Sequence, residues 1–236
     1  MKIIWLGQGG FLLEAEGQRM LIDPFLSNIV EERQGLKRLV EPPLTINELR
    51  PDFIFITHNH LDHFDPIALP EIHHQYPKVL IAGPESVMQK AKEFNFDTSV
   101  LVRVNKSESL HFGVFKIIAT PAYHSDPYTV GILIQVGGKT IYLSSDTLFN
   151  ETLASDVRLL AGREIDVAII CINGKLGNMN WQEAITVIEQ LQPKLAIPMH
   201  YGMFAENTVD PSSFLEGCKK INIEPLELLH GVQVEI

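Results

Sequence analysis

The sequence has little cysteine: Cys171 and Cys218 are the only two among 236 residues, and they are far apart and outside any Cys-x-x-Cys spacing. We therefore expect two buried thiols in a reducing compartment rather than a disulfide. A chain of this length can bury a sizeable core, so it needs neither disulfides nor oligomerisation to fold.

The sequence also lacks a long hydrophobic run. No stretch reaches the roughly 18 apolar residues that a membrane span requires. The apolar run near Met1 is too short for a signal-peptide core, and no cleavage-site pattern follows it. We expect a cytoplasmic protein with no membrane partner.

Positive charge is scarce as well, with 19 Lys and Arg against 29 Asp and Glu and a formal net charge of -10. Nucleic acid is not expected as a partner, because phosphate binding needs a basic footprint. A local basic or metal-lined pocket for a small anion is still compatible with this charge. Low-complexity segments, short repeats and Gly- or Ser-rich linkers are absent, so we expect one domain over residues 1–236.

The hydrophobic pattern predicts short strands first and alternating helices and strands later. Strands are expected at 3–6, 11–14, 19–22, 53–56, 79–82, 109–119, 129–136, 140–144, 167–172, 195–199 and near Val232, and helices at 65–75, 85–93, 151–161, 181–191 and 211–220. Two strand-rich blocks, each followed by helix–strand units, predict an α/β fold with two sheets face to face and helices outside, a four-layer αββα sandwich. Residues 27–50 contain Pro42-Pro43 and are expected to form an irregular excursion, a candidate lid or oligomer contact.

Three histidines and an aspartate lie within six residues, in His58-Asn59-His60-Leu61-Asp62-His63, directly after the buried strand 53–56. Loops at the ends of buried strands are where functional sites are usually assembled. Imidazole nitrogens and carboxylate oxygens are the ligands of zinc, iron or manganese. The cluster therefore predicts a metal site.

Three further residues, His124, Asp146 and His200, each follow a predicted strand. Taken alone, each is most simply a satisfied polar residue. Together with the first cluster they give seven protein ligands, five imidazoles and two carboxylates, which is enough for two adjacent ions. Asp23 also ends a strand and is expected to orient a ligating imidazole by accepting its other N–H, or else to be a turn aspartate before Pro24.

The order Asp23, His58-x-His60-x-Asp62-His63, His124, Asp146 and His200 resembles that of the metallo-β-lactamase-fold hydrolases, over residues 3 to the C-terminus. The resemblance implies the αββα sandwich, with the metals at one edge between the two sheets. It also implies that His58, His60 and His124 hold the first metal, that Asp62, His63 and His200 hold the second, and that Asp146 bridges both. True β-lactamases usually lack an aspartate at the position of Asp146, so antibiotic hydrolysis is not expected.

Residues 172–180 and 200–211 look like those of the L-ascorbate-6-phosphate lactonase group, although the chain is shorter than that lactonase and lacks its insertions. This resemblance suggests a lactonase that opens a (phospho)sugar lactone, and it favours manganese where five imidazoles favour zinc; iron fits as well. A phosphorylated or acidic substrate needs further contacts. Lys175 is the candidate phosphate contact, Asn173, Asn178 and Asn180 are candidate neutral donors, and Tyr201 is a candidate for orienting the substrate.

The hypothesis for the reaction is that two divalent cations activate water for attack on the lactone carbonyl. Asp62 and Asp146 are the candidate catalytic carboxylates, and Asp62 is the candidate proton shuttle. The same ligands suit a phosphodiesterase that acts on a small or cyclic phosphodiester, and the sequence does not separate the two reactions. A non-catalytic metal- or ligand-binding module is the third alternative, and a homo-oligomer is compatible with all three.

Overall fold

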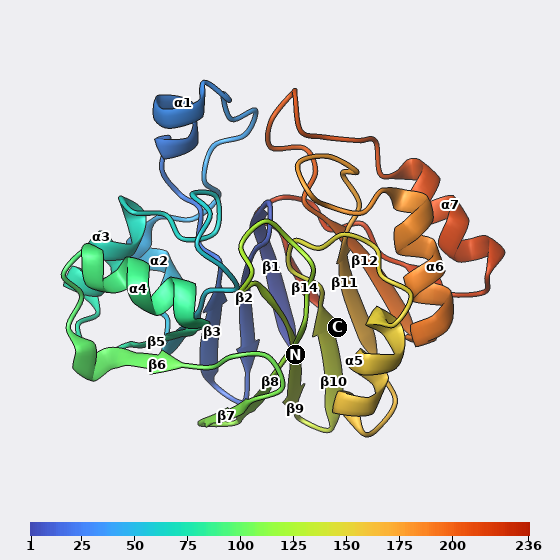
Figure 1. The fold of residues 1–236 in the computed structure, drawn as a ribbon, viewed down its shortest axis with the longest axis horizontal. Helices are drawn as coiled ribbons and strands as arrows, with labels where there is room; N and C mark the ends of the chain where they lie inside the picture. The colour runs from blue at the N-terminus through green and yellow to red at the C-terminus, as the bar shows by residue number, and fades with distance from the viewer.

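The computed structural model describes residues 1–236 and contains two seven-stranded mixed sheets (Figure 1). The first sheet has the order β14 (Gln233–Glu235), β1 (Lys2–Gly7), β2 (Gly10–Ala15), β3 (Gln18–Ile22), β4 (Phe53–Phe55), β5 (Leu80–Gly83) and β6 (Leu101–Arg103). The second has the order β13 (Glu224–Pro225), β12 (Leu195–Met199), β11 (Val167–Cys171), β10 (Lys139–Leu143), β9 (Val130–Val136), β8 (Phe115–Pro121) and β7 (Ser109–Phe112). In each sheet one half is antiparallel and the other half, β3 to β6 or β10 to β13, is parallel.

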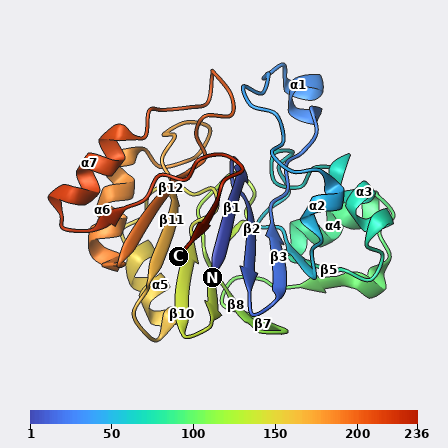
Figure 2. The ribbon, with the colours of Figure 1, turned by 180° about the vertical axis from the view of Figure 1, so that it is seen from behind.

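Helices cover the outer face of each sheet, as Figures 1 and 2 show from opposite sides. The helices α2 (Ile46–Leu49), α3 (Ala68–Gln75) and α4 (Glu85–Glu93) lie on the first sheet, and α5 (Leu153–Ala161), α6 (Trp181–Leu191) and α7 (Ser212–Lys220) lie on the second. The largest apolar cluster, of 47 buried residues, draws on both sheets and on α5, α6 and α7. The predicted αββα sandwich is therefore confirmed. None of the helices has the length and apolar character needed to cross a membrane.

Local sequence signals explain where several helices begin. Asn180 and Glu183 form a capping box at the start of α6, with Asn180 Oδ1 accepting from the backbone N–H of Glu183 at 3.0 Å. The helix expected from residue 65 begins only at Ala68. Asp65 still acts as its cap, because Asp65 Oδ1 accepts from the backbone N–H groups of Ile67 and Ala68 at 2.9 and 3.0 Å.

Two strand predictions need correction. The strand block expected over 109–119 is divided by a hairpin turn at Gly113, whose φ of 50° is in the left-handed region that glycine adopts freely. Strands β6 and β13 were not predicted, because they have only three and two residues and each pairs on one side only, with β5 and β12. So short an edge strand carries little periodic signal.

Residues 27–50 are not wholly irregular, because they contain α1 (Ile29–Gln34) as well as α2. The prolines lie between these two helices, and Gly35, with a φ of 75°, ends α1. α1 stands above the rest of the sandwich in Figure 1. Its buried residues Ile29 and Val30 belong to a small apolar cluster with Phe25, Met203 and Phe204. The lid and oligomer roles of this segment stay predictions, as does the single domain.

Candidate metal centre

Polar side chains follow six strands whose carboxyl ends point in the same direction within each sheet. β1, β3 and β4 run in one direction in the first sheet, and β8, β10 and β12 run in one direction in the second. The residues that follow these strands include Gln8, Asp23, His58, His124, Asp146 and His200. The fold thus collects side chains from distant parts of the sequence at one edge of the sandwich.

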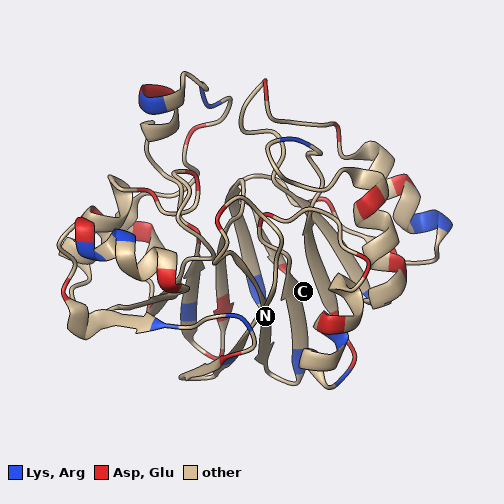
Figure 3. Ribbon diagram, viewed as in Figure 1, with Lys and Arg blue, Asp and Glu red and all other residues tan.

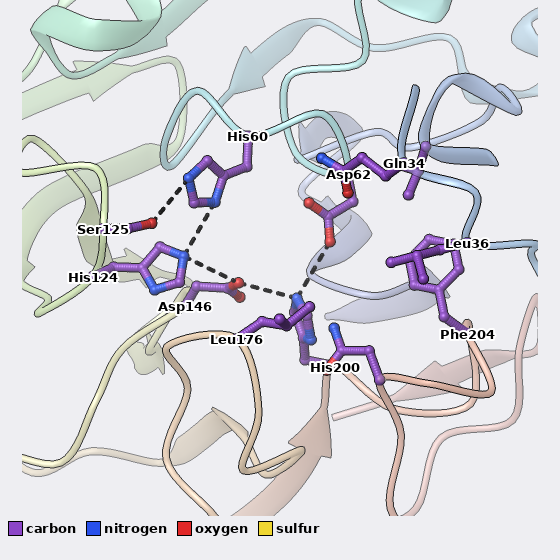
Figure 4. A pocket seen from close by; sticks show the side chains of 12 residues that line it. Gln34, Leu36, His60, Asp62, His124, Ser125, Asp146, Leu176, His200 and Phe204 are labelled. Atoms are coloured by element: carbon purple, nitrogen blue, oxygen red, sulfur yellow. Dashed lines mark hydrogen bonds and ion pairs between the residues drawn. The ribbon is translucent and has the colours of Figure 1, made fainter. Parts of the chain in front are cut away.

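The first group of donor atoms consists of three imidazoles. His60 Nδ1 lies 3.1 Å from His124 Nε2, as Figure 4 marks with a dashed line, and 3.1 Å from His58 Nε2. Ligands about 2.1 Å from a tetrahedral zinc ion are about 3.4 Å from one another, so this spacing is close to that of a ligand triad. Three ring nitrogens that point their lone pairs toward one another fit a cation at their centre.

The second group contains Asp62, His63 and His200. Asp62 Oδ2 lies 3.5 Å from His200 Nε2 and 3.9 Å from His63 Nε2. The two imidazoles are buried, whereas Asp62 is partly exposed toward the cavity. The donor atoms of this group are therefore farther apart than those of the first group. They are still close enough together to bind one metal ion.

Asp146 lies between the two groups. Its Oδ1 is 3.4 Å from His63 Nε2, and its Oδ2 is 3.1 Å from His200 Nε2 and 3.7 Å from His124 Nε2. His63 Nε2 and Asp146 Oδ1 are both buried without a hydrogen-bond partner. Buried polar atoms are normally paired, so these two atoms without a partner indicate that the imidazoles and carboxylates here fit a divalent cation.

The charges of the site reinforce this reading. Burial, and then the neighbouring charge of His63, holds the pKa of His58 well below its ordinary value. Burial is the largest single influence on His200 and lowers its pKa, but the charges and hydrogen bonds of Asp146 and Asp62 together outweigh it and raise the pKa to about 9. Burial likewise opposes ionisation of Asp146, yet the charges of His200 and His63 keep its pKa well below the usual range. The carboxylate between the two groups is thus ionised at neutral pH.

A buried hydrogen-bond network fixes the orientation of the His63 ring through its Nδ1 atom. Asp23 Oδ2 accepts from His63 Nδ1 at 2.7 Å and from the Thr57 hydroxyl at 2.6 Å, while Asp23 Oδ1 accepts from the Thr57 backbone N–H at 2.7 Å. The Ser145 hydroxyl in turn donates to Thr57 Oγ1 at 2.7 Å. The network therefore links residues that follow β3, β4 and β10, and it leaves His63 Nε2 facing the site.

Gln8 is a site residue that the sequence analysis did not identify, because it stands alone between glycines and outside any cluster of titratable residues. Gln8 Nε2 donates to Asp62 Oδ2 at 2.8 Å and lies 3.4 Å from His200 Nε2. The Gln8 carbonyl also accepts from the backbone N–H of His200 at 3.2 Å. A usable signal was present, since Gln8 follows a strand as the other site residues do.

The loop of residues 172–180 is held against the first group. His124 Nδ1 donates to the Gly177 carbonyl at 2.9 Å. A Cβ on Gly177 would lie 2.8 Å from that same nitrogen, and the φ of Gly177 is 90°. Only glycine allows the loop to approach this closely, so Gly177 fixes both the loop and the orientation of the His124 ring.

The site opens into a cavity of about 300 Å³, lined by His60, Asp62, His124, Asp146 and His200 on one side. Its other walls come from residues 30–36, from Leu176 and from residues 204–207. Apolar lining side chains are Val30, Leu36, Leu176 and Phe204, and neutral polar ones are Gln34, Ser125 and Asn207. The volume suits a small molecule.

None of the five predicted substrate contacts lines this cavity. Lys175 Nζ donates to the Glu206 carbonyl at 2.9 Å, and Asn180 is the cap of α6. The Tyr201 ring packs on Trp5 with a centroid distance of 4.9 Å. These three side chains therefore serve the surrounding structure, where the sequence predicted contact with substrate.

Asn173 and Asn178 are also buried beside the cavity rather than in its wall. Asn173 Nδ2 donates to Asn207 Oδ1 at 2.7 Å. This contact fixes the Asn207 amide and leaves its Nδ2 as a donor. Asn207 is thus the cavity-lining amide in this region, and Asn173 positions it.

The comparisons with known proteins agree with this architecture. The family described as the "Beta-lactamase superfamily domain" matches residues 18–201. A "UPF0173 metal-dependent hydrolase" of Alkaliphilus metalliredigens is 30% identical over 239 residues, which cover 97% of both chains. Another, from Carboxydothermus hydrogenoformans, is 28% identical over 235 residues and 94% of both chains.

Solved structures of similar fold cover the whole chain. A metallo hydrolase from the archaeon Ignicoccus hospitalis has a TM-score of 0.78 at 23% identity, covering 100% of this chain and 98% of that one. The isothiocyanate hydrolase from Delia radicum gut bacteria has a TM-score of 0.79 at 19% identity, covering 100% and 99%. At these identities the likeness establishes the fold.

Proposed function

Because the chain belongs to the metallo-β-lactamase superfamily, among the UPF0173 metal-dependent hydrolases, we propose that it opens a small lactone ring by hydrolysis. The chain is a metal-dependent hydrolase. The proposal adds the substrate class, a lactone. One observation carries the proposal: two groups of donor atoms, with Asp146 between them, face a single small cavity.

The proposed ligands are those of the two groups. His58, His60 and His124 would hold one ion, Asp62, His63 and His200 the other, and Asp146 would contact both. Five imidazoles and two carboxylates suit zinc, manganese or iron, and we propose zinc or manganese. When bound, such a pair of ions activates water and stabilises negative charge on the carbonyl oxygen.

Two side chains of the cavity are proposed to handle the proton and the substrate. Hydrolysis forms a bond from the carbonyl carbon to the water oxygen and breaks the ring C–O bond, so one proton must move from water to the departing ring oxygen. Asp62 is a carboxylate that faces the cavity, and it is proposed to carry that proton. The free Nδ2 of Asn207 is proposed to donate to the lactone and to orient it.

A substrate panel tests the proposal. Purified protein reconstituted with zinc or with manganese is expected to hydrolyse simple lactones faster than cyclic or aryl phosphodiesters. A preference for phosphodiesters would replace the lactonase with the phosphodiesterase alternative. Full metal loading without turnover of lactones, esters or phosphodiesters would instead support a non-catalytic binding module.

A cytoplasmic location is also proposed. Cys171 and Cys218 are both free and buried, which suits a reducing compartment.

A further inference from the structure

Part of the cavity wall is apolar, which a site for a sugar phosphate would not require. Leu36 and Phe204 lie side by side on the side away from His60 and His124, and Leu176 lies near Asp146 and His200 (Figure 4). Phe204 is held from behind by Phe25, with ring centroids 5.9 Å apart. The apolar side chains come from three segments distant in sequence, and those of Leu36 and Phe204 belong to one apolar cluster, so the wall is built by the fold.

Leu176 is the most unusual member of this wall. Its side chain is 69% exposed although it lines the cavity, and its φ of 51° is in the left-handed region that a branched residue rarely adopts. The adjacent Gly177 is bonded through its carbonyl to His124, which fixes the position of Leu176 relative to the metal ligands. An exposed leucine held in a strained conformation at a site indicates a functional contact.

No positively charged side chain of the protein lines the cavity. Asp62 and Asp146 are its acidic lining residues, and neither lysine nor arginine lines it. Lys175, the cation that the sequence analysis assigned to substrate binding, does not line the cavity and donates to the Glu206 carbonyl. Acidic and basic residues are interspersed over the outer helices (Figure 3), and the net charge of -10 disfavours the approach of anions. A negatively charged substituent on the substrate would therefore lose its hydration in this cavity without forming an ion pair with a protein side chain.

We propose that the substrate is an uncharged lactone with an apolar substituent, and that Leu176 is a specificity-determining residue that covers this substituent. This inference rests on the proposed lactone hydrolysis. The ring would face the metal donors, and the substituent would lie against Leu36, Leu176 and Phe204. The phosphorylated sugar suggested by sequence resemblance is replaced by a neutral, apolar molecule.

The test compares three lactones with the same ring: one unsubstituted, one with an alkyl substituent and one with a carboxylate-ended substituent of equal length. Wild-type holoenzyme is expected to show a kcat/KM for the alkyl lactone at least about tenfold above that for the carboxylate lactone. Leu176→Ala is expected to lower kcat/KM for the alkyl lactone by about tenfold, mainly through KM, and to leave the unsubstituted lactone within about twofold. Leu159→Ala is the matched control, because Leu159 is an 81% exposed leucine on α5.

A second variant and a binding measurement keep the two proposals separable. Leu176→Lys is expected to shift the preference toward the carboxylate lactone. Calorimetric titration with the corresponding lactams, which resist hydrolysis, should show tighter binding of the alkyl form that Leu176→Ala weakens. Lactam selectivity without lactone turnover would refute the lactonase but retain the apolar pocket. Equal binding of the alkyl and carboxylate lactams, or a preference for the carboxylate, would refute the apolar pocket even if lactones are hydrolysed.

Discussion

His63 Nδ1 lies 2.7 Å from Asp23 Oδ2, and both side chains are fully buried. The imidazole must donate through Nδ1, because the carboxylate can only accept there. This fixes the ring so that Nε2 faces Asp146, at 3.4 Å from Oδ1. The contact therefore selects the tautomer that a metal ligand needs.

Replacement of Asp23 tests this relationship. Asp23→Asn keeps the shape of the side chain but replaces one carboxylate oxygen with an NH2 group. With the amide oxygen on the Thr57 backbone N–H, this NH2 group faces His63 Nδ1, so His63 loses its orienting acceptor. We expect metal affinity to fall by about 10- to 100-fold, with the loss confined to one of two ions. Competition with a chromophoric chelator measures this affinity. Asp97→Asn, at an exposed aspartate, is the control, and unchanged affinity in Asp23→Asn would show that the contact is only structural.

The αββα fold and the gathering of the candidate ligands could be anticipated from sequence, because both depend on local patterns. Buried strands such as 53–56 are continuous apolar runs, and each candidate ligand follows such a run or falls in the dense His58 to His63 cluster. The cavity wall could not be anticipated. The wall depends on the packing of α1 against Phe204, and these two segments are about 170 residues apart in the sequence. Hydrophobic periodicity predicts local helices and strands but not which distant segments pack together. Lys175 was misjudged for the same reason, since the carbonyl of Glu206 that binds it is distant in sequence.

The position of the α1 segment depends on Arg38. This buried guanidinium donates to the carbonyls of Ser27 at 2.9 Å and Val40 at 2.8 Å, and it lies 4.8 Å from the centre of the Phe25 ring. Arg38→Met should cost about 2 kcal/mol of unfolding free energy, because it leaves buried carbonyls unpaired.

The functional effect of Arg38→Met should follow from a displaced cavity wall. We expect faster proteolysis within residues 25–40 and a lower kcat/KM for alkyl lactones. Arg33→Met is the control, since Arg33 is exposed on α1. Denaturant titration measures the unfolding free energy, limited proteolysis the accessibility of the segment, and steady-state kinetics the kcat/KM. Protection equal to that of the wild type would show that Arg38 does not hold the segment.

The two cysteines should be unreactive in the folded protein. Burial raises the pKa of Cys171 and of Cys218 to about 12. The thiolate is the nucleophile, so a raised pKa leaves almost none at neutral pH, and reactivity should rise only as the pH approaches that value. Mass spectrometry after iodoacetamide treatment is expected to find both thiols free in the folded protein and both alkylated in denaturant. Rapid alkylation of Cys171 under native conditions at neutral pH would contradict its burial.

The most direct test of the account is the metal content of three proteins, measured by elemental analysis after reconstitution and removal of free ions. The wild type should bind two ions per chain, and His200→Ala should retain one, because its loss leaves the His58, His60 and His124 group intact. Asp146→Ala should retain no more than one, because Asp146 lies between both groups and the His58, His60 and His124 group stays intact. Two ions retained in Asp146→Ala, or a single ion in the wild type, would contradict a dinuclear centre joined by Asp146.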